Sequence, residues 1–444
     1  MNWPTYPKYQ QSKNDVLGEI PATWVTTRLK MLLTEPMSYG ANAAADDNTP
    51  DNPRYVRITD IGADGNLRPD TFRSLPPEVA APYLLSDGDV LFARSGATVG
   101  KTFMYVPSWG RCCYAGYLIR ARVNRSKLLP EYLNYFTMTT SYWQHIFSEQ
   151  IQATIQNVSA ERYGSLPVPV PPLSVQHSII DFLNIETNKI DALIAKQEQL
   201  ITTLREDRTA TVAHAVTKGL DHHAEMTDSG VEWIGLIPSH WTLPQLGMHS
   251  VVGNGATPSR ENLNYWTNGT VPWLNSSHVN RAEITDSDQF VTELARTSCH
   301  LPVVPAGSVL IGLTGQGKTR GMASLLKFES TINQHIAFVT PTSSKINPRF
   351  LREVLHSAYQ VLRDLSEENG STKGGLTCGA IRKLPVPVPP VTEQSEILNF
   401  LETRCGKIDA LIDKANQMIR TLREYRSALI TDAVTGKIDV RGAA

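Results

Sequence analysis

Leu166-Pro-Val-Pro-Val-Pro-Pro172 is repeated as Leu384-Pro-Val-Pro-Val-Pro-Pro390, 218 residues further along the chain. The same spacing separates Lys189-Ile-Asp-Ala-Leu-Ile194 from Lys407-Ile-Asp-Ala-Leu-Ile412. Because the two pairs keep one spacing without a gap, the segment that contains them is duplicated as a unit. A solenoid has much shorter repeats, of about 20 to 50 residues. The chain is therefore predicted to consist of two half-molecules in tandem.

The duplication extends to the segments that precede the prolines. Gly18-Glu-Ile-Pro-Ala-Thr-Trp24 matches Gly235-Leu-Ile-Pro-Ser-His-Trp241, whereas the rest of these segments has diverged. Short β-like runs alternate there with Gly, Asn, Asp and Pro turns. The β-like runs include Val56–Ile58, Asp89–Phe92, Val309–Ile311 and His335–Val339, and helical stretches follow near 130–148 and 348–365. We predict one α+β head in each half.

Each proline run leads into an arm with helical periodicity. A residue that precedes proline avoids helical geometry, so the helices should start after the prolines, with Ser174 and Thr392 as N-caps. In the first arm, a short apolar stretch precedes a longer helix from about Thr187 to about Val216. Apolar spacing of four and three residues alternately indicates a coiled-coil seam. The seam contains Ile190, Ile194, Ile201, Leu204, Ile408, Ile412, Ile419 and Leu422.

The two arms are predicted to pair with each other as an antiparallel coiled coil, because their seams are equally long. The alternative is two amphipathic helices that each pack on their own head. Pairing gives a rod of roughly 45 Å, since about 30 residues rise 1.5 Å each. The predicted fold class is α+β, with two mixed α/β heads in a pseudo-two-fold arrangement separated by two long helices. The predicted domains are heads at 1–165 and 221–383, and helical spacers at 166–220 and 384–444.

The composition excludes several protein classes. The chain has 444 residues, of which 41% are hydrophobic and 19% are charged, and its net charge is −1. No apolar run approaches the roughly 20 residues of a membrane span, and the N-terminal residues do not resemble a signal peptide. The five cysteines form no Cys-x-x-Cys pair, which argues against a zinc site and a disulfide framework. These features predict a cytoplasmic protein with no metal site.

One motif favours an enzymatic interpretation. Gly312-Leu-Thr-Gly-Gln-Gly-Lys-Thr319 matches the phosphate-binding loop G-x-x-x-x-G-K-[ST], in which the lysine and backbone amides hold nucleotide phosphates. A helix should then begin at Lys318, but the following residues are β-like. The matching loop Ser95–Thr102 of the first half has one intervening residue too few. We favour contact with a DNA phosphate, with a nucleotide-binding enzyme as the alternative. No other catalytic constellation emerges.

The duplicated residues resemble the conserved regions of type I restriction–modification specificity subunits. The resemblance is carried by the proline runs, by Gln176 and Gln394, by the Lys-Ile-Asp-Ala-Leu-Ile cores and by the Ala-Val-Thr endings of the arms. The segments that end at Trp24 and Trp241 resemble the openings of target recognition domains in that family. The resemblance covers nearly the whole chain and recurs in both halves.

The resemblance implies a DNA reader without catalysis of its own. Each target recognition domain would bind one half of an asymmetric bipartite site in double-stranded DNA, and the paired helices would set the spacer. Two modification subunits would dock on the helices and methylate adenines with S-adenosylmethionine. Restriction subunits would add ATP-driven translocation and cleavage. S-adenosylmethionine, ATP and magnesium are expected on those partners and no cofactor on this chain. A coiled-coil structural adaptor is a further alternative.

Side chains that contact DNA are predicted in both heads. Arg and Lys can pair with guanine, and Asn or Gln with adenine, in the major groove. The predicted contacts are Arg54, Arg57, Arg94, Lys101, Arg111, Asn275, Gln316, Lys318, Arg320 and Lys373. Lys101 and Lys318 stand out, because both halves keep a lysine after glycine in the same loop. The net charge of −1 is not that of a stand-alone DNA-binding protein, so the positive charge must be local or supplied by partners.

Overall fold

The computed structural model describes residues 3–12, 14, 16–62, 66–151, 157–315, 317–367 and 375–442. The chain forms two compact units, one of Met1–Glu198 with Asn416–Ala444 and one of Gln199–Ala415. We call them unit 1 and unit 2. Each unit holds one head, the first half of its own arm and the last half of the other arm. The units divide in the middle of the arms, whereas the predicted domain boundaries lie where heads and arms meet.

The head of unit 1 contains a four-stranded antiparallel sheet in the order β4-β9-β6-β7. Its strands are β4 (Ser38–Tyr39), β9 (Leu118–Ala121), β6 (Val90–Ala93) and β7 (Thr102–Met104). A parallel pair consists of β5 (Arg54–Val56) and β8 (Cys112–Tyr114). The helices of this head are α1 (Pro77–Ala80), α2 (Pro130–Phe136), α3 (Thr140–Ile151) and α4 (Ala160–Gly164).

The central strand β6 is covered on both faces, since successive side chains of a strand point to opposite sides. Val90 and Phe92 join the core that contains α2 and α3. Leu91 and Ala93 face the other way and pack with residues of β5 and β8. This burial on both faces explains why the run is continuously apolar. The predicted strand at Val56–Ile58 ends at Val56, because Ile58–Asp60 forms a 3-10 turn in which the Asp60 carboxylate accepts a bond from the Arg57 N–H.

The head of unit 2 repeats this layering around the strand β17 (Val309–Gly312). The five-stranded sheet has the order β13-β20-β17-β18-β15, and a smaller sheet has the order β16-β14-β19. The other strands are β13 (Ser250–Asn254), β20 (Ile336–Pro341), β18 (Ala323–Leu326), β15 (Glu283–Ile284), β16 (Phe290–Val291), β14 (Val271–Leu274) and β19 (Thr331–Ile332). The helices are α6 (Glu293–Ser298), α7 (Pro348–Ser357), α8 (Tyr359–Glu367) and α9 (Cys378–Lys383).

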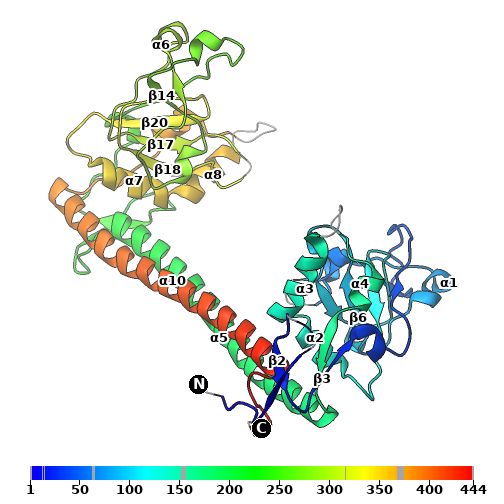
Figure 1. Ribbon diagram of the computed structural model, residues 1–444. Coiled ribbons are helices and arrows are strands. Elements are labelled where there is room, and N and C mark those ends of the chain that lie inside the picture. The colour runs from blue at the N-terminus through cyan, green and yellow to red at the C-terminus, as the bar shows by residue number, and fades with distance from the viewer. Residues whose placement is uncertain are drawn as a thin grey trace. The chain divides into compact units, whose positions relative to one another are not determined.

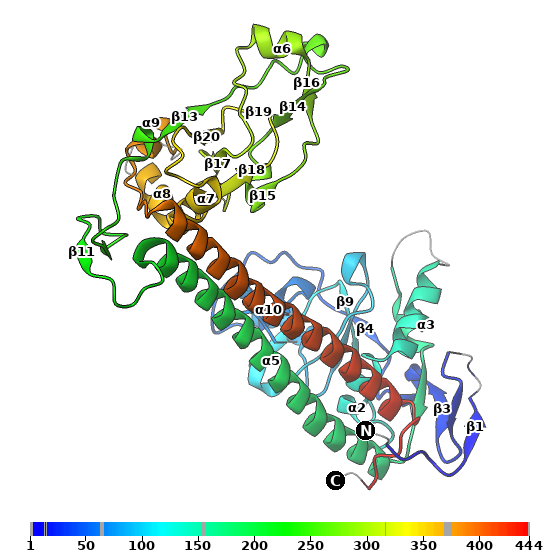
Figure 2. The same ribbon diagram turned by 90° about the vertical axis from the view of Figure 1, so that its left-hand side faces the viewer.

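The arms are the helices α5 (Leu173–Lys218) and α10 (Val391–Val434), which run side by side in Figure 1 and Figure 2. In unit 1 the start of α5 shares a core with the end of α10. In unit 2 the end of α5 shares a core with the start of α10. The pairing is therefore antiparallel, as predicted. Of the predicted seam residues, Ile190, Ile201, Ile408 and Ile419 are buried, and Ile194, Leu204, Ile412 and Leu422 are half-buried.

Two details of the arms differ from the prediction. Both helices begin directly after the prolines, so Ser174 and Thr392 lie within the first turn and are not N-caps. The short apolar stretch and the long helix of the first arm are one continuous α5. The buried Thr187 is accommodated within this helix because its hydroxyl donates to the Leu183 carbonyl one turn earlier, at 2.6 Å.

The proline runs are extended and pair with the chain just after Trp24 and Trp241, the first as a strand and the second through isolated bridges. β10 (Pro167–Val170) pairs antiparallel with β3 (Val25–Arg28) in unit 1. In unit 2, the Val386 N–H donates to Pro244 at 3.0 Å and the Val388 N–H donates to Thr242 at 2.8 Å. Alternate residues of such a strand donate to the partner, so the prolines occupy positions whose N–H is not required. The Pro-Val alternation is thereby explained.

A buried glutamine fastens each head to its arm. In unit 1, the Gln176 Oε1 accepts from the Leu129 N–H at 2.8 Å, and its Nε2 donates to the carbonyls of Lys127 and Pro171 at 3.0 and 2.9 Å. The side chains of Gln176 and Gln394 are both fully buried. Gln394 makes the same three bonds, to Asn347, Lys345 and Pro389, at 2.8, 2.7 and 2.8 Å. The junction between head and arm is therefore built identically in both units.

Each arm ends against the hairpin that opens a head. The hairpins are β1 (Tyr9–Gln11) with β2 (Glu19–Pro21), and β11 (Met226–Asp228) with β12 (Leu236–Pro238). Gly219 and Gly436 follow the two arms with φ of 75° and 76°, a conformation that favours glycine. A Cβ on Gly436 would lie 2.4 Å from the ring of Pro21. The last turn of α10 is therefore seated directly on the first hairpin.

We expect substitution of the buried glutamines to loosen this junction. Gln176→Ala leaves one N–H and two carbonyls without partners, and each such group costs about 1 to 3 kcal/mol when buried. The free energy of unfolding, measured by urea denaturation, should fall by about 2 to 4 kcal/mol, and Gln394→Ala should behave alike. Gln199→Ala, on an exposed position of α5, is the control and should change it by less than about 0.5 kcal/mol. Equal losses in test and control variants would contradict the role of the glutamines.

Candidate nucleic-acid interface

The glycine-rich loop of unit 2 lacks the helix that should follow a phosphate-binding loop. The residues after Lys318 form turns that lead into β18, so no helix begins there. The carbonyls of Gly317 and Lys318 accept bonds from Arg363 at 2.8 Å and from the Tyr359 hydroxyl at 3.0 Å. These bonds tie the loop to α8 and leave the ammonium group of Lys318 exposed. The phosphate-binding-loop alternative is therefore not supported, and Lys318 is free to meet an external anion.

Two of the predicted DNA contacts in unit 1 hold the head together. The Arg57 guanidinium donates to both carboxylate oxygens of buried Asp60, at 3.0 and 2.7 Å, and to the Thr71 carbonyl at 3.1 Å. This bonding raises the pKa of Arg57 above its ordinary value. Arg54 donates to the Arg68 carbonyl at 2.6 Å and lies 5.7 Å from the ring of Phe72. Both side chains are engaged within the protein.

The other three predicted contacts of unit 1 are placed differently. Lys101 and Arg111 are exposed. Arg94 is half-buried and stacks at 4.9 Å on the ring of Tyr39. Lys101 also lines a cavity of about 560 Å³ together with Trp143 and other residues. Positive charge in this head is therefore available at Lys101 and Arg111, while Arg94 is held against an aromatic ring.

In unit 2 the predicted contacts are also divided. Arg320 is buried, with 8% of its surface exposed, and it pairs with Glu367 at 3.0 Å. The Asn275 Oδ1 accepts from the N–H and the hydroxyl of Ser277, which shapes the turn after β14. Gln316 and Lys373 lie outside the described residues. Among the predicted contacts of this head that the structure describes, Lys318 is the one whose charge faces solvent.

The sequence interpretation missed a polar surface at one end of the sheets in unit 2. The turn between β19 and β20 carries Gln334 and His335, and hydrogen bonds join them to the loops after β13 and β17. The Thr257 hydroxyl donates to the Gln334 Oε1 at 2.5 Å, and the Thr314 hydroxyl lies 2.9 Å from the His335 Nδ1. A signal existed, because polar residues interrupt two β-like runs there. Sequence alone does not reveal that the three loops meet.

Unit 1 has the same loop arrangement with different side chains. The Arg94 N–H donates to the Tyr117 carbonyl at 3.0 Å, as the Leu313 N–H donates to the His335 carbonyl at 2.8 Å. Tyr117 therefore stands where His335 stands in unit 2, and its side chain is 66% exposed. The two heads share a scaffold and differ at the tips of their loops.

The arms are joined by equivalent ion pairs. Asp191 pairs with Arg426 in unit 1, and Asp409 pairs with Arg208 in unit 2, each at 3.0 Å. Both aspartates belong to the repeated Lys-Ile-Asp-Ala-Leu-Ile cores. Partly exposed ion pairs of this kind contribute about 0 to 1 kcal/mol to the free energy of unfolding. Their main effect is therefore to favour one register between the two helices.

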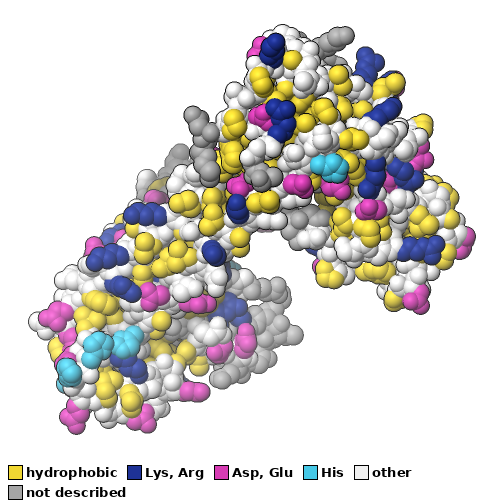
Figure 3. Space-filling view, turned by 90° about the horizontal axis from the view of Figure 1, so that it is seen from below, with side chains coloured by type: hydrophobic (Ala, Val, Ile, Leu, Met, Phe, Trp, Pro, Cys, Tyr) yellow, Lys and Arg dark blue, Asp and Glu magenta, His cyan; other side chains and the backbone are white. Residues whose placement is uncertain are grey.

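The described residues carry a mixed surface charge and buried, protonated thiols. Lys and Arg are interspersed with Asp and Glu on the face drawn in Figure 3. Within the described ranges, no cluster of His, Cys, Asp and Glu could hold a metal ion. Burial raises the pKa of Cys112 to about 11 and that of Cys113 to about 12, so both thiols stay protonated and unreactive.

The described helices include none that is long and apolar enough to cross a membrane.

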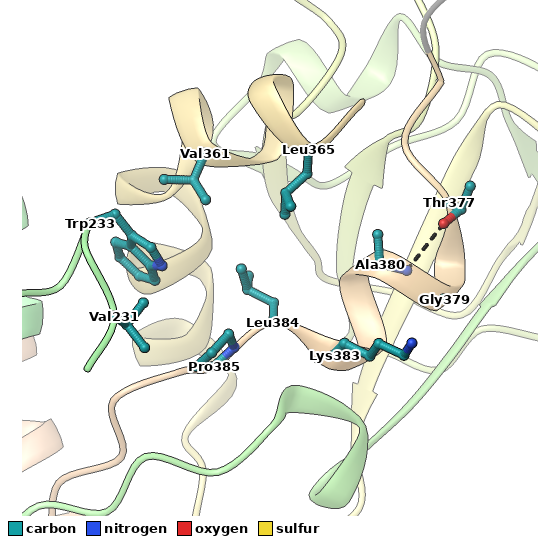
Figure 4. A pocket seen from close by; sticks show the side chains of 10 residues that line it. All are labelled: Val231, Trp233, Val361, Leu365, Thr377, Gly379, Ala380, Lys383, Leu384 and Pro385. Carbon is teal, nitrogen blue, oxygen red and sulfur yellow. Dashed lines mark hydrogen bonds between the residues drawn. The ribbon is translucent and has the colours of Figure 1, made fainter. Parts of the chain in front are cut away.

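A cavity of about 570 Å³ opens at the base of the head in unit 2. Figure 4 shows Trp233 from the β11–β12 hairpin and Leu365 from α8 on its walls, with Leu384 between them. Among the described residues that line it, Lys383 is the one charged side chain, and most of the others are apolar.

Comparison with known proteins agrees with this geometry. A family model described as the type I restriction modification DNA specificity domain matches residues 57–203 and 239–420. The chain is 22% identical to the EcoKI specificity subunit of Escherichia coli K12, over 95% of this chain and 90% of that protein. It is 24% identical to the EcoR124I/EcoR124II specificity subunit of Escherichia coli over 37% of this chain, which is 39% of that protein.

Two solved structures have the same fold. A chain of a type I restriction–modification system, solved to explain complex assembly and conformational transition, superposes with a TM-score of 0.72 at 17% identity, over 96% of this chain and 99% of that one. The HsdS subunit of Thermoanaerobacter tengcongensis superposes with a TM-score of 0.56 at 17% identity, over 94% and 98%. Since the family model covers most of both halves, the chain belongs to the type I restriction modification DNA specificity family.

Proposed function

We propose that the chain is the DNA-recognition subunit of a type I restriction–modification complex, and that each head binds one half of an asymmetric bipartite site. The observation that carries this proposal is the combination of an identical junction with different loop tips. Gln176 and Gln394 seat both heads on their arms through the same three bonds. The loop tips nevertheless carry Tyr117 in unit 1 and His335 in unit 2. Equal scaffolds with unequal tips suit the recognition of two different sequences.

The proposed role is recognition without catalysis. Methyl transfer would take place on modification subunits with S-adenosylmethionine, and translocation and cleavage on restriction subunits with ATP and magnesium. The buried, protonated cysteines and the mainly apolar lining of the cavity beside Trp233 are compatible with this division. A structural adaptor would hold two protein-binding heads, and it would bind DNA without sequence preference or not at all.

Methylation mapping tests the proposal. The full chain is expressed in cells with the modification subunit of its own system, and methylated adenines are located by single-molecule sequencing. We expect a split motif, one half of which changes when residues 25–165 are exchanged for the head of a related subunit. Absence of any split motif, with the modification subunit bound to the chain, would overturn the proposal.

Equivalent apolar positions on the arms suggest where the two modification subunits dock. Leu193 and Met418 lie in unit 1, and Leu411 and Leu200 lie at the repeat-related positions in unit 2. All four side chains are about half exposed. Each one precedes a seam isoleucine, and such positions flank the seam on one side of an antiparallel pair. Two equivalent surfaces fit two copies of one partner.

Stoichiometry provides a test of this docking. Leu193→Glu with Met418→Glu places charge on the surface of unit 1 and should reduce the modification subunits per chain from two to one, as measured by native mass spectrometry. Adding Leu411→Glu and Leu200→Glu should remove the second copy. Lys196→Glu, at an exposed position of the same arm, is the control. Two bound copies in the fourfold variant would exclude these surfaces.

Lys318 and Arg320 should respond differently to substitution. Lys318→Ala removes an exposed cation, so it should weaken DNA binding and reduce the slope of log K against log salt by about one. Arg320→Ala instead removes a buried guanidinium that pairs with the exposed Glu367, and the lost packing should lower the melting temperature of the protein. Titration of a labelled duplex at several salt concentrations measures the slope. An unchanged slope for Lys318→Ala would remove this residue from the interface.

The arms are expected to set the spacer between the half-sites. Insertion of one heptad after Glu198 and one after Ala415 lengthens both helices at the boundary of the two units and keeps the seam pattern. Seven residues add about 10 Å, equal to about three base pairs. Methylation mapping should show a longer spacer between unchanged half-sites. Altered half-sites with a fixed spacer would contradict this function of the arms.

A further inference from the structure

The polar surface of unit 2 is organised around one exposed side chain. Gln334 lies at the tip of the β19–β20 turn, where its amide bonds on one side to Thr257 and on the other side to His335. The turn itself is held rigidly, because the buried Asn333 accepts from the His335 N–H at 3.0 Å and donates from its backbone to Leu274 at 3.0 Å. An exposed glutamine is normally free to rotate, whereas this one is bonded to Thr257 of another loop and to His335 of its own turn.

Hydrogen bonds hold both polar ends of the Gln334 amide. The Thr257 hydroxyl donates to the Gln334 Oε1 at 2.5 Å, and an amide nitrogen can only donate, so the Gln334 Nε2 donates to the His335 Nε2 at 3.2 Å. The Thr314 hydroxyl lies 2.9 Å from the His335 Nδ1, so the chain of hydrogen bonds continues into the loop after β17. These bonds limit rotation of the Gln334 amide.

The bonded amide keeps capacity for a ligand. Its oxygen has a second lone pair and its nitrogen has a second hydrogen, because each uses only one in the chain of hydrogen bonds. A glutamine that accepts from N6–H and donates to N7 recognises adenine in the major groove. We propose that Gln334 reads an adenine in the half-site bound by unit 2, and that Thr257 and His335 are positioning residues that fix its amide. This inference rests on the proposed DNA-recognition function.

Unit 1 must read its half-site with other chemistry. Gly116 and Tyr117 occupy the equivalent turn, and neither has a side-chain amide. The Tyr117 ring is exposed there instead. Substitution of Gln334 should therefore act on one half-site alone. This asymmetry gives an internal control, since the half-site of unit 1 is read in the same molecule.

The test compares variants of the full chain expressed with its modification subunit. Gln334→Leu keeps the size of the side chain and removes both polar atoms. Methylation mapping should then show that one A·T position in the half-site of unit 2 has become degenerate, with the other half-site and the spacer unchanged. In duplex titration, discrimination at that position should fall by about fivefold to 150-fold, the range of one bidentate base contact.

Two further variants distinguish a loss of base recognition from a loss of folded structure. Thr257→Val keeps the shape of the side chain but removes the donor to Gln334, so it should relax the same position to a smaller extent. Gln245→Leu changes an exposed glutamine at the base of the same head and should leave the motif intact. Melting temperatures within a few degrees of the unsubstituted chain would show that the variants are folded.

The outcomes distinguish the inference from the function on which it rests. If the unsubstituted chain directs no split methylation, the proposed function fails. If a split motif exists and Gln334→Leu leaves all its positions unchanged, only the role of Gln334 fails. Relaxation at a G·C position, or in the half-site of unit 1, would also overturn the assignment of Gln334 to adenine.

Discussion

The buried amide of Gln176 bonds at once to the loop before α2 and to the proline strand before α5, and Gln394 makes the same bonds in unit 2. A buried polar group that loses its partner costs more than the bond itself contributes. Rotation of a head on its arm would break all three bonds together. Each glutamine therefore helps to orient its head and the loops of that head, together with the apolar core that head and arm share.

The arms and the loops make opposite demands on sequence. The arms need the same residues twice, because Asp191 must meet Arg426 in one unit and Asp409 must meet Arg208 in the other. The loop tips need no such match, since they are anchored through backbone bonds such as that from Leu313 to His335. Divergence of the tips is therefore compatible with a common scaffold. A protein that reads two sequences at a set separation requires this combination.

Much of the fold was predictable because its signals are local or repeated. The 218-residue repeat indicates two halves, and the spacing of Ile190 and its successors indicates a seam that the structure places between the arms. The starts of α5 and α10 were misplaced, since Ser174 and Thr392 favour caps but the prolines already precede the first turn. The domain boundaries and the DNA contacts stay predictions. A sequence does not tell whether an arginine is already paired within the protein. Arg57 and Arg320, for example, form ion pairs with Asp60 and Glu367.

The sequence by itself determined the duplication, the two helical arms, the strand at the centre of each head and the membership of a family. These follow from periodicity and from repetition, which are readable along one dimension. Only the tertiary structure decided which polar side chains face outward together. Thr257, Thr314 and Gln334 are far apart in the chain, and they meet because β13, β17 and β20 lie next to one another in one sheet. Such proximity arises from strand pairing between distant segments, and no local pattern of residues encodes it.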